Sequence, residues 1–468
     1  MTILELSEEL RAGRLTCTAL TKACLAAIAE NDQSGRGLNS VAEIDPDALF
    51  YARQIDEEIR RGGPKSPLHG IPVLVKDNVD VKGLHTTAGS LALADLIAKE
   101  DAPLVGKLRE AGALILGKAN LSEFAYFMSN EHAPSGYSSR GGQVVHAYVK
   151  DVNPSGSSSG SAVAVSARLV PAAIGTETDG SLMSPSSVNA ICTIKPTVGL
   201  VSRRGIIPIS HVQDTAGPMT TNVTDLALVL QAIAGADEGD AATLNCKARD
   251  YMAALMTDCQ DLRIGICRKD CTKEALAALD RAESILKEAG AQVKEIPFAD
   301  TRLEDWQVFP WEFKAGIDRY LAQHDCRCRS LGDIIAFNKE HKEQCLRYGQ
   351  ALLEASEAAG GCLKDSEYLN RRLSLEEKSH RLLDGTMDEY GVDCLLSAGK
   401  FQKGNLAPVS GNPCLSLPAV KVTEERFEPV NYQLYGRPYG EAVLLHAAYA
   451  LEQALSIENR PAWVKMPF

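Results

Sequence analysis

Two serine clusters carry residues that could do nucleophilic chemistry. The first, NPSGSSSGS, spans residues 153–161, and the second, GTETDGS, spans residues 175–181 and ends in Ser181. A serine hydroxyl needs a base before it can attack a carbonyl carbon. The candidate base is Lys76, which lies in the apolar stretch GIPVLVKDNVD. The sequence therefore offers two serine-bearing turns and one lysine that a single site could use.

Lys76 is unusual because a lysine is rarely buried without a partner. Burial in a strand would disfavour the charged ammonium and lower its pKa by up to about 3–5 units. A neutral amine near neutral pH can act as a general base. Side chains alternate across a strand, so we expect Asp77 to point away from Lys76 and not to neutralise it. The alternative is a lysine that ends the strand in solvent.

The first serine cluster has three other interpretations. A flexible Gly/Ser linker is one, but patterned structure resumes on both sides. A phosphate-binding loop would need a lysine after the glycines, and none follows. Residues 156–160 also match the G-x-S-x-G turn of an α/β-hydrolase, with Ser158 as the nucleophile. That turn needs an acid and then a histidine downstream, for which the sequence offers His211, His324, His341, His380 and His446.

The elements that must position these residues alternate between helices and strands. Residues 2–62 show apolar spacings of three and four and are predicted to be helical throughout. Residues 101–127 are predicted as helix, strand and second helix, and residues 262–298 as strand, helix and strand. This alternation predicts an α/β layer architecture. Without a Pro/Ser-rich linker, we expect an N-terminal helical segment, 1–62, packed on one α/β/α domain, 63–468.

The composition excludes several classes of protein. With 49 basic and 61 acidic residues the formal net charge is -12, which argues against binding to nucleic acid or anionic lipid. The N-terminal region lacks a basic stretch followed by an apolar run, and no segment reaches about 18 apolar residues. The 13 cysteines form no paired C-x-x-C pattern, and Cys326 and Cys328 are too close for a zinc site. We expect a cytoplasmic protein with reduced thiols and no metal.

A set of ordered motifs resembles the amidase signature family, whose members hydrolyse amides with a Ser-cisSer-Lys triad. The resemblance covers residues 67–219 and rests on PLHGIPVLVKDNVD, TTAGS, GKANLSEFA, NPSGSSSGSAVAV, GTETDGS, KPTVGLVSRRGIIPIS and QDTAGPM. It implies an α/β fold with a large mixed, twisted β-sheet covered by helices on both faces. It also implies that Lys76 is the base, that Ser157 is the bridging serine after a cis peptide bond, and that Ser181 is the nucleophile.

The resemblance assigns further roles around this triad. It implies that backbone N–H groups of the second serine turn hold the oxyanion, namely those of Thr178, Asp179, Gly180 and Ser181. It implies that Ser158 supports the triad. Residues implied to line the substrate pocket are Tyr126, Phe127, Met128, Ser129 and Asn130. No cofactor or metal is implied. The expected partner is a small-molecule or peptide amide substrate. We expect a monomer or homodimer that binds neither nucleic acid nor a membrane.

Two residues depart from the common family pattern. Asp179 stands where many members have a second glycine, and Met183 stands where many have an arginine. A carboxylate pointing at a developing oxyanion would oppose catalysis. Asp179 must therefore face away, bind its own turn or receive a cationic group. The motifs around it resemble the peptide-amidase-like branch more than the amidotransferase subunits that act on glutaminyl-tRNA.

These features favour an amide hydrolase that acts on peptide C-terminal amides or on small carboxamides. One alternative is the glutaminase subunit of an amidotransferase, which would need partner chains. Another is an inactive binding scaffold, although the complete set of Lys76, Ser157 and Ser181 argues against it. The C-terminal stretch VKVTEERFEPVNYQLYGRPYGE lacks the glycine-rich run common in the family, so the acyl-side pocket stays undefined.

Overall fold

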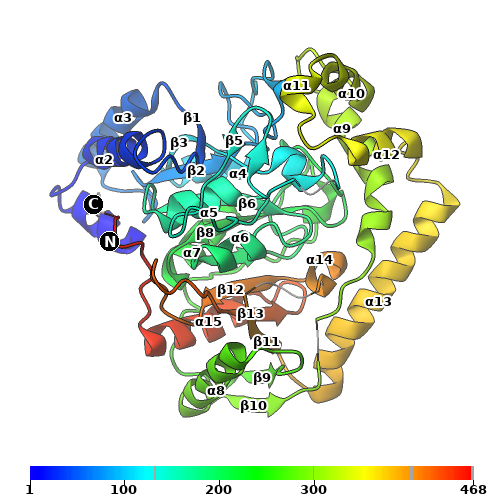
Figure 1. The fold of residues 1–468 in the computed structure, drawn as a ribbon. Coiled ribbons are helices and arrows are strands. Elements are labelled where there is room, and N and C mark those ends of the chain that lie inside the picture. The colour runs from blue at the N-terminus through cyan, green and yellow to red at the C-terminus, as the bar shows by residue number, and fades with distance from the viewer. Residues whose placement is uncertain (131–132, 299, 401–403, 465–468) are drawn as a thin grey trace.

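The computed structural model describes residues 1–130, 133–298, 300–400 and 404–464. In this part of the chain eleven strands form one sheet, in the order β1-β3-β2-β6-β8-β7-β12-β13-β11-β9-β10 (Figure 1). These strands are β1 (Val41–Ile44), β2 (Pro72–Lys76), β3 (Leu114–Ala119), β6 (Ala172–Glu177), β7 (Cys192–Lys195), β8 (Thr215–Thr220), β9 (Arg263–Ile266), β10 (Gln292–Glu295), β11 (Cys394–Gly399), β12 (Cys414–Pro418) and β13 (Asn431–Gly436). A separate ribbon pairs β4 (Tyr137–Ser138) with β5 (Gly142–Gln143).

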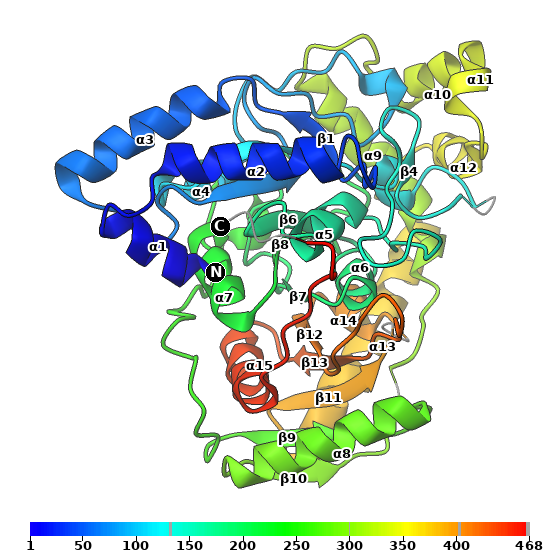
Figure 2. The ribbon, with the colours of Figure 1, turned by 60° about the vertical axis from the view of Figure 1, so that its left-hand side comes forward.

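Helices flank this sheet. The longer ones are α1 (Ile3–Arg11), α2 (Cys17–Asn31), α3 (Ala48–Gly62), α4 (Pro103–Glu110), α5 (Ser159–Ser166), α7 (Val223–Ile233), α8 (Lys273–Glu288), α9 (Phe309–Ala322), α10 (Leu331–Glu340), α12 (Ala351–Ala359), α13 (Ser366–Tyr390) and α15 (Glu441–Leu455). Short turns of helix are η1 (Leu91–Leu93), η2 (Glu123–Tyr126), α6 (Met183–Val188), η3 (Ala241–Thr243), η4 (Asp305–Gln307), α11 (Lys342–Cys345) and α14 (Leu406–Ser410). α7 packs on β8, α15 on β12 and α8 on β11, and Figure 2 shows α8 along the β9–β10 end of the sheet.

The sheet is mixed, as expected for the predicted fold class. β2 runs parallel to both β3 and β6, whereas β8 runs antiparallel to β6. The predicted strand, helix and strand of residues 262–298 are β9, α8 and β10, and the two strands are parallel. The α/β prediction and the mixed sheet are therefore confirmed.

The strands that matter for the site are β2 and β6, which are neighbours. β2 has the sequence PVLVK, a β-branched run that is buried along its whole length, as a strand covered on both faces requires. β6 is buried in the same way. Because the two strands are parallel, their carboxyl ends meet at the same edge of the sheet, and residues that follow both strands lie close together.

Helix α5 connects the two serine clusters, and its residues are all buried. Its sequence SGSAVAVS is made of small side chains, which let the helix lie against β6 and β2. At Gly160 a β-carbon would lie 2.3 Å from the carbonyl oxygen of Ser40 and 2.4 Å from that of Asn120. Glycine is therefore required at this position by the close approach of backbone.

Two elements differ from the sequence-based expectation. Residues 2–62 are not helical throughout, because β1 lies among them and pairs antiparallel with β3 at the edge of the sheet. The helix predicted to follow β3 is also wrong. In η2 the residues Phe124, Ala125 and Tyr126 all have positive φ, and the buried Glu123 side chain accepts hydrogen bonds from Ser139 instead. Tertiary contacts override the local helical pattern here.

Other expectations concern the chain as a whole. Nine of the 13 cysteines are buried, which fits their prediction as small hydrophobic residues. No helix among the described residues is long and apolar enough to cross a membrane. The boundary between segment 1–62 and domain 63–468 stays a prediction.

Candidate active site

Lys76 is the last residue of β2 and its side chain is fully buried. Its Nζ lies 2.8 Å from Ser157 Oγ and 2.9 Å from Ser158 Oγ. It also lies 2.9 Å from Thr176 Oγ1 and 3.2 Å from the Thr176 carbonyl oxygen. The lysine is thus surrounded by hydroxyl and carbonyl oxygens, and Asp77 makes its ion pair with Lys118 on the other side of the strand.

Burial lowers the pKa of Lys76 from its usual 10.5 to about 7. The cost of desolvating the ammonium is the main cause, and it outweighs the attraction of the buried carboxylates of Glu177 and Asp214, which act in the opposite direction. A substantial fraction of Lys76 is therefore neutral near pH 7, and a neutral amine has a lone pair that can accept a proton.

The hydrogen bonds around Lys76 distinguish the two neighbouring serines. Ser158 Oγ donates to the carbonyl oxygen of Thr176 at 3.0 Å, so this hydroxyl hydrogen is already used. Since a hydroxyl has one hydrogen, Ser157 is the better donor to the lone pair of Lys76. The peptide bond between Gly156 and Ser157 is cis, in agreement with the family resemblance.

The second serine turn lies beside the first. The Ser158 N–H donates to the carbonyl oxygen of Ser181 at 3.3 Å, so helix α5 does return the chain to the same edge of the sheet. Gly180 has φ +83, which side chains other than hydrogen rarely permit. The structure therefore brings Lys76, Ser157, Ser158 and Ser181 together.

Two buried carboxylates fix the second serine turn. Glu177 Oε2 accepts the backbone N–H of Leu182 at 2.7 Å and that of Met183 at 3.0 Å. The hydroxyl of Thr178 donates to Asp214 Oδ1 at 2.5 Å. Burial raises the pKa of Asp214 to about 6. These contacts hold the backbone from Thr178 to Ser181 from both ends.

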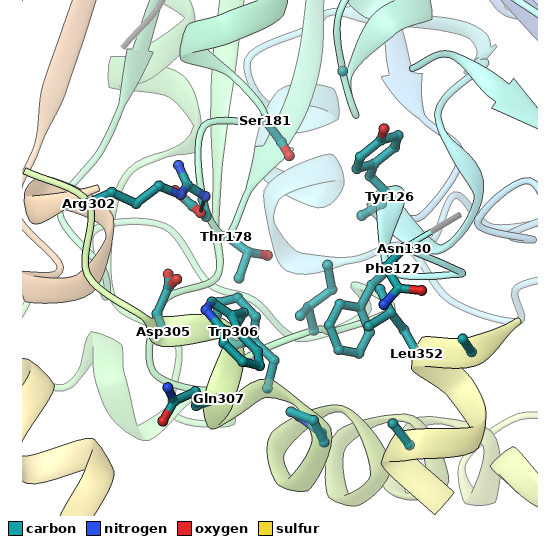
Figure 3. A pocket seen from close by; sticks show the side chains of 18 of the residues that line it. Tyr126, Phe127, Asn130, Thr178, Ser181, Arg302, Asp305, Trp306, Gln307 and Leu352 are labelled. Carbon is teal, nitrogen blue, oxygen red and sulfur yellow. Dashed lines mark hydrogen bonds and ion pairs between the residues drawn. The ribbon is translucent and has the colours of Figure 1, made fainter. Parts of the chain in front are cut away.

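A cavity of about 850 Å³ opens in front of Ser181 (Figure 3). Most of its lining is apolar or aromatic and comes from η2, the residues following Asp300, α9 and α12. The side chains that give it this character are Tyr126, Phe127, Ile209, Trp306, Phe309, Pro310 and Leu352. Its polar lining includes Asn130, Thr178, Asp179, Arg302, Asp305, Gln307 and Arg371.

The residues predicted to line the pocket divide into two groups. Asn130, Tyr126 and Phe127 line the cavity. Met128 and Ser129 do not; they line a much smaller hollow of about 20 Å³ on the other side of Tyr126, together with Glu123 and Tyr137. Met128 belongs to a core cluster with Phe124 and Phe313. The prediction that Met128 and Ser129 line the substrate pocket is therefore corrected. The irregular backbone of η2 explains the difference, because it points successive side chains in directions that a helix would not.

Met183 and Asp179, the two departures from the family pattern, differ in whether they line the cavity. Met183 is fully buried in the core next to α14 and β12 and does not line the cavity. Asp179 does line it and forms an ion pair with Arg302, a residue 123 positions away in the sequence. Asp179 has thus received a cationic group, which was one of the alternatives open from the sequence.

Sequence reasoning did not single out several residues of the site. Glu177 and Asp214 lie inside the quoted motifs GTETDGS and QDTAGPM, so acidic residues within those motifs were an available signal. Arg302, Asp305 and Trp306 lie between β10 and α9 in a segment without a recognisable pattern, and only the fold brings them to the cavity. No group of three His, Cys, Asp or Glu side chains in the described part of the chain is arranged to hold a metal ion.

Comparison with known proteins agrees with this site. The family model Amidase matches residues 19–403. The chain belongs to the amidase family. Among solved amidases, the native peptide amidase from Stenotrophomonas maltophilia is 39% identical with a TM-score of 0.93, and 99% of each chain is covered. An amidase family protein from Bacillus anthracis is 36% identical with a TM-score of 0.91, covering 97% of this chain and 91% of that one.

Curated relatives of this amidase have two kinds of name. A probable amidase from Arabidopsis thaliana is 36% identical over 96% of this chain and 89% of its own length. One subunit of the glutamyl-tRNA(Gln) amidotransferase from Lachnoclostridium phytofermentans is 30% identical over 98% of both chains. The higher identity and the structural neighbours favour the first kind. The chain is accordingly an amide hydrolase with the amidase signature fold.

Proposed function

We propose that this amidase cleaves the carboxamide C–N bond through Ser181, with Ser157 as a proton relay and Lys76 as the base. The observation that carries the proposal is the 2.8 Å contact between a fully buried Lys76 Nζ and Ser157 Oγ, beside a turn whose Ser181 opens on the cavity. Ser158 supports Lys76 through its own 2.9 Å contact.

In the proposed reaction, Ser181 Oγ attacks the amide carbon while its proton passes to Ser157 Oγ, and the Ser157 proton passes to the lone pair of Lys76. Backbone N–H groups of the turn from Thr178 to Ser181 donate to the oxyanion. The C–N bond then breaks, and Lys76 returns the proton through Ser157 to the leaving amine. Water then attacks the acyl ester while its proton passes through Ser157 to Lys76. The relay returns this proton to Ser181 Oγ as the ester C–O bond breaks, and the released carboxylic acid loses its proton to solvent.

The proposed substrates are C-terminal amides of peptides. A cavity of about 850 Å³ with a mainly apolar and aromatic lining has the size of sites that enclose molecules larger than a small aliphatic amide. Structures of a peptide amidase, one of them in complex with the inhibitor chymostatin, are similar to this chain over 99% of its length. We also propose that the enzyme is cytoplasmic and works as a monomer or homodimer.

The roles of the serines are tested with a serine-directed fluorophosphonate probe and peptide mass spectrometry. We expect the label on Ser181, and we expect Lys76→Ala and Ser157→Ala to slow labelling more than Ser158→Ala does. A label on Ser158 that survives in Ser181→Ala would overturn the proposal in favour of an α/β-hydrolase turn.

The substrate is tested with a panel that contains an N-acetylated dipeptide amide, the same dipeptide as a free acid, benzamide and glutamine. Ammonia release and the mass of the acid product are measured. We expect the dipeptide amide to be the best substrate. Preference for glutamine, with little activity on the dipeptide amide, would contradict the proposal and support the amidotransferase alternative. Probe labelling without turnover of any panel member would contradict the substrate class alone.

A further inference from the structure

The ion pair between Asp179 and Arg302 lies at the oxyanion turn itself. Asp179 is two residues before Ser181, its carboxyl group is largely buried, and it lines the cavity. Arg302 comes from the segment that precedes η4, and Figure 3 shows its side chain reaching toward the turn that carries Thr178 and Ser181. The pair thus joins the turn to the segment between β10 and α9, which also lines the cavity.

A carboxylate at this position creates an electrostatic problem for the reaction. The backbone N–H of Asp179 is one of the proposed oxyanion donors, so its side chain is covalently tied to the place where negative charge develops. In a partly buried site the negative charge of the Asp179 carboxylate and that of the nearby oxyanion would repel each other. An uncompensated Asp179 would therefore raise the energy of the tetrahedral intermediate.

We propose that Arg302 is a positioning residue that cancels the charge of Asp179 and so makes this acidic turn compatible with oxyanion stabilisation. The inference rests on the proposed roles of the turn and of Ser181. It explains how this chain tolerates an aspartate in place of glycine, because the compensating charge comes from a distant segment.

The other charged groups around Asp179 have partners of their own. Glu177 of β6 accepts two backbone N–H groups of the turn. Asp305 of η4 accepts from Gln213 Nε2 at 3.0 Å. Arg371 of α13 pairs with Glu367 at 2.6 Å. Among the described residues, Arg302 is thus the cation that contacts Asp179.

These surroundings also determine how the pair responds to pH. Burial, followed by repulsion from Asp305, raises the pKa of Asp179, and burial raises the pKa of Asp305; Arg302 acts against both rises. Burial holds the pKa of Asp179 at about 8 even beside Arg302, so without Arg302 this carboxyl group would keep its proton to still higher pH and be harmless while protonated. Above that pH the bare carboxylate would face the oxyanion, so loss of Arg302 should matter more as the pH increases.

The test compares the wild type with Arg302→Gln, Asp179→Asn and the double variant, using kcat on a dipeptide amide from about pH 7 to about pH 10. We expect the ratio of wild-type kcat to Arg302→Gln kcat to grow with pH and to reach about tenfold. A larger factor is not expected, because the Arg302 side chain is 62% exposed and water screens the pair. In the double variant the growth with pH should disappear, and Arg302→Lys should restore most of the activity.

A matched control is Arg263→Gln, which removes the similarly exposed Arg263–Asp393 pair at a site remote from the cavity. It should leave the pH profile of kcat unchanged.

Two results would overturn the inference. One is a pH-independent loss of kcat in Arg302→Gln that Asp179→Asn does not relieve, which would mean that the pair has a structural role only. The other is no loss of kcat in Arg302→Gln, which would mean that the pair does not affect the reaction. If Arg302→Gln does not fold, Arg302→Met is compared with the Arg302→Met/Asp179→Asn double variant instead, and a ratio between their kcat values that does not change with pH overturns the inference. Absence of probe labelling at Ser181 in the wild type would instead contradict the proposed function, on which the inference rests.

Discussion

Lys76 Nζ and Ser157 Oγ lie 2.8 Å apart although the two residues are 81 positions apart in the sequence. β2 delivers the lysine, and the loop before α5 delivers the serine. The contact depends on the parallel pairing of β2 with β6, because α5 packs on both of these strands. The proposed catalytic base thus lies at the end of an apolar strand beside a serine-rich loop, and burial lowers its pKa.

The first prediction concerns the pH dependence of activity. Since Lys76 must be neutral to accept a proton and its pKa is about 7, kcat/KM should rise as the pH increases through about 7. Below this value it should fall about tenfold per pH unit. Initial rates on a dipeptide amide in buffers of constant ionic strength would measure the profile. An acidic limb near the pKa of an ordinary carboxyl group, and none near 7, would contradict the assignment.

The second prediction concerns stability and uses Lys76→Met. Because the folded-state pKa of Lys76 is about 7 and its usual value is 10.5, the unfolded chain binds one more proton between these limits. The free energy of unfolding of the wild type should therefore rise with pH in this window. At about pH 7 we expect the inactive Lys76→Met to be more stable than the wild type by about 1–3 kcal/mol, since the hydrogen bonds lost offset part of the desolvation cost.

This stability difference should shrink as the pH increases from about 7 to 10.5 and should stay constant below about 7. Urea denaturation followed by circular dichroism at several pH values would measure it. The exposed Lys82 supplies the control, because Lys82→Met should change stability by less than about 0.5 kcal/mol at every pH. A Lys76→Met variant that is less stable than the wild type at neutral pH would contradict the burial argument.

The residues of the proposed triad could be named from the sequence because they lie in short, ordered motifs. Lys76, Ser157 and Ser181 could be named, and so could the α/β class, since strand and helix patterns carry it. The walls of the cavity could not be predicted. Arg302 and Trp306 reach it only through the packing of α9, α12 and α13, and no local pattern encodes that packing.

Local reasoning also failed where tertiary contacts replaced local ones. The segment of η2 has a helical composition, yet its buried Glu123 binds Ser139 and the backbone takes positive φ at three successive residues. That turn sends Met128 into the core and leaves Tyr126 at the cavity. β1 was missed for a similar reason: Val41, Glu43 and Ile44 pair with β3, which lies far along the chain.

The third prediction concerns the glycine that lets α5 approach the sheet. In Gly160→Ala the new β-carbon would lie within 2.6 Å of three backbone atoms, Ser40 O, Asn120 O and Asn120 N, none of which can move without shifting a strand or a loop. We expect a loss of at least about 3 kcal/mol in the free energy of unfolding, or failure to fold. The control is Gly385→Ala in α13, where no atom lies within 4 Å of the added carbon and a gain of up to about 1 kcal/mol is expected. Equal stabilities for the two variants in urea denaturation would contradict the close approach.

The fourth prediction concerns Trp306 at the cavity. Its side chain is 62% exposed, which is unusual for a tryptophan, and it lines the cavity opposite Tyr126 and Phe127 (Figure 3). A peptide bound with its C-terminal amide at Ser181 would cover this ring and gain the free energy of burying it. Trp306→Ala should therefore raise KM for a dipeptide amide roughly tenfold with little change in kcat. For benzamide, kcat/KM should change less than about twofold, because the single ring of benzamide does not extend from Ser181 to the indole of Trp306. Leu244→Ala, at an equally exposed apolar residue outside the cavity, should change neither value. Equal effects of Trp306→Ala on the two substrates would argue that the indole shapes the reaction centre and does not bind the peptide.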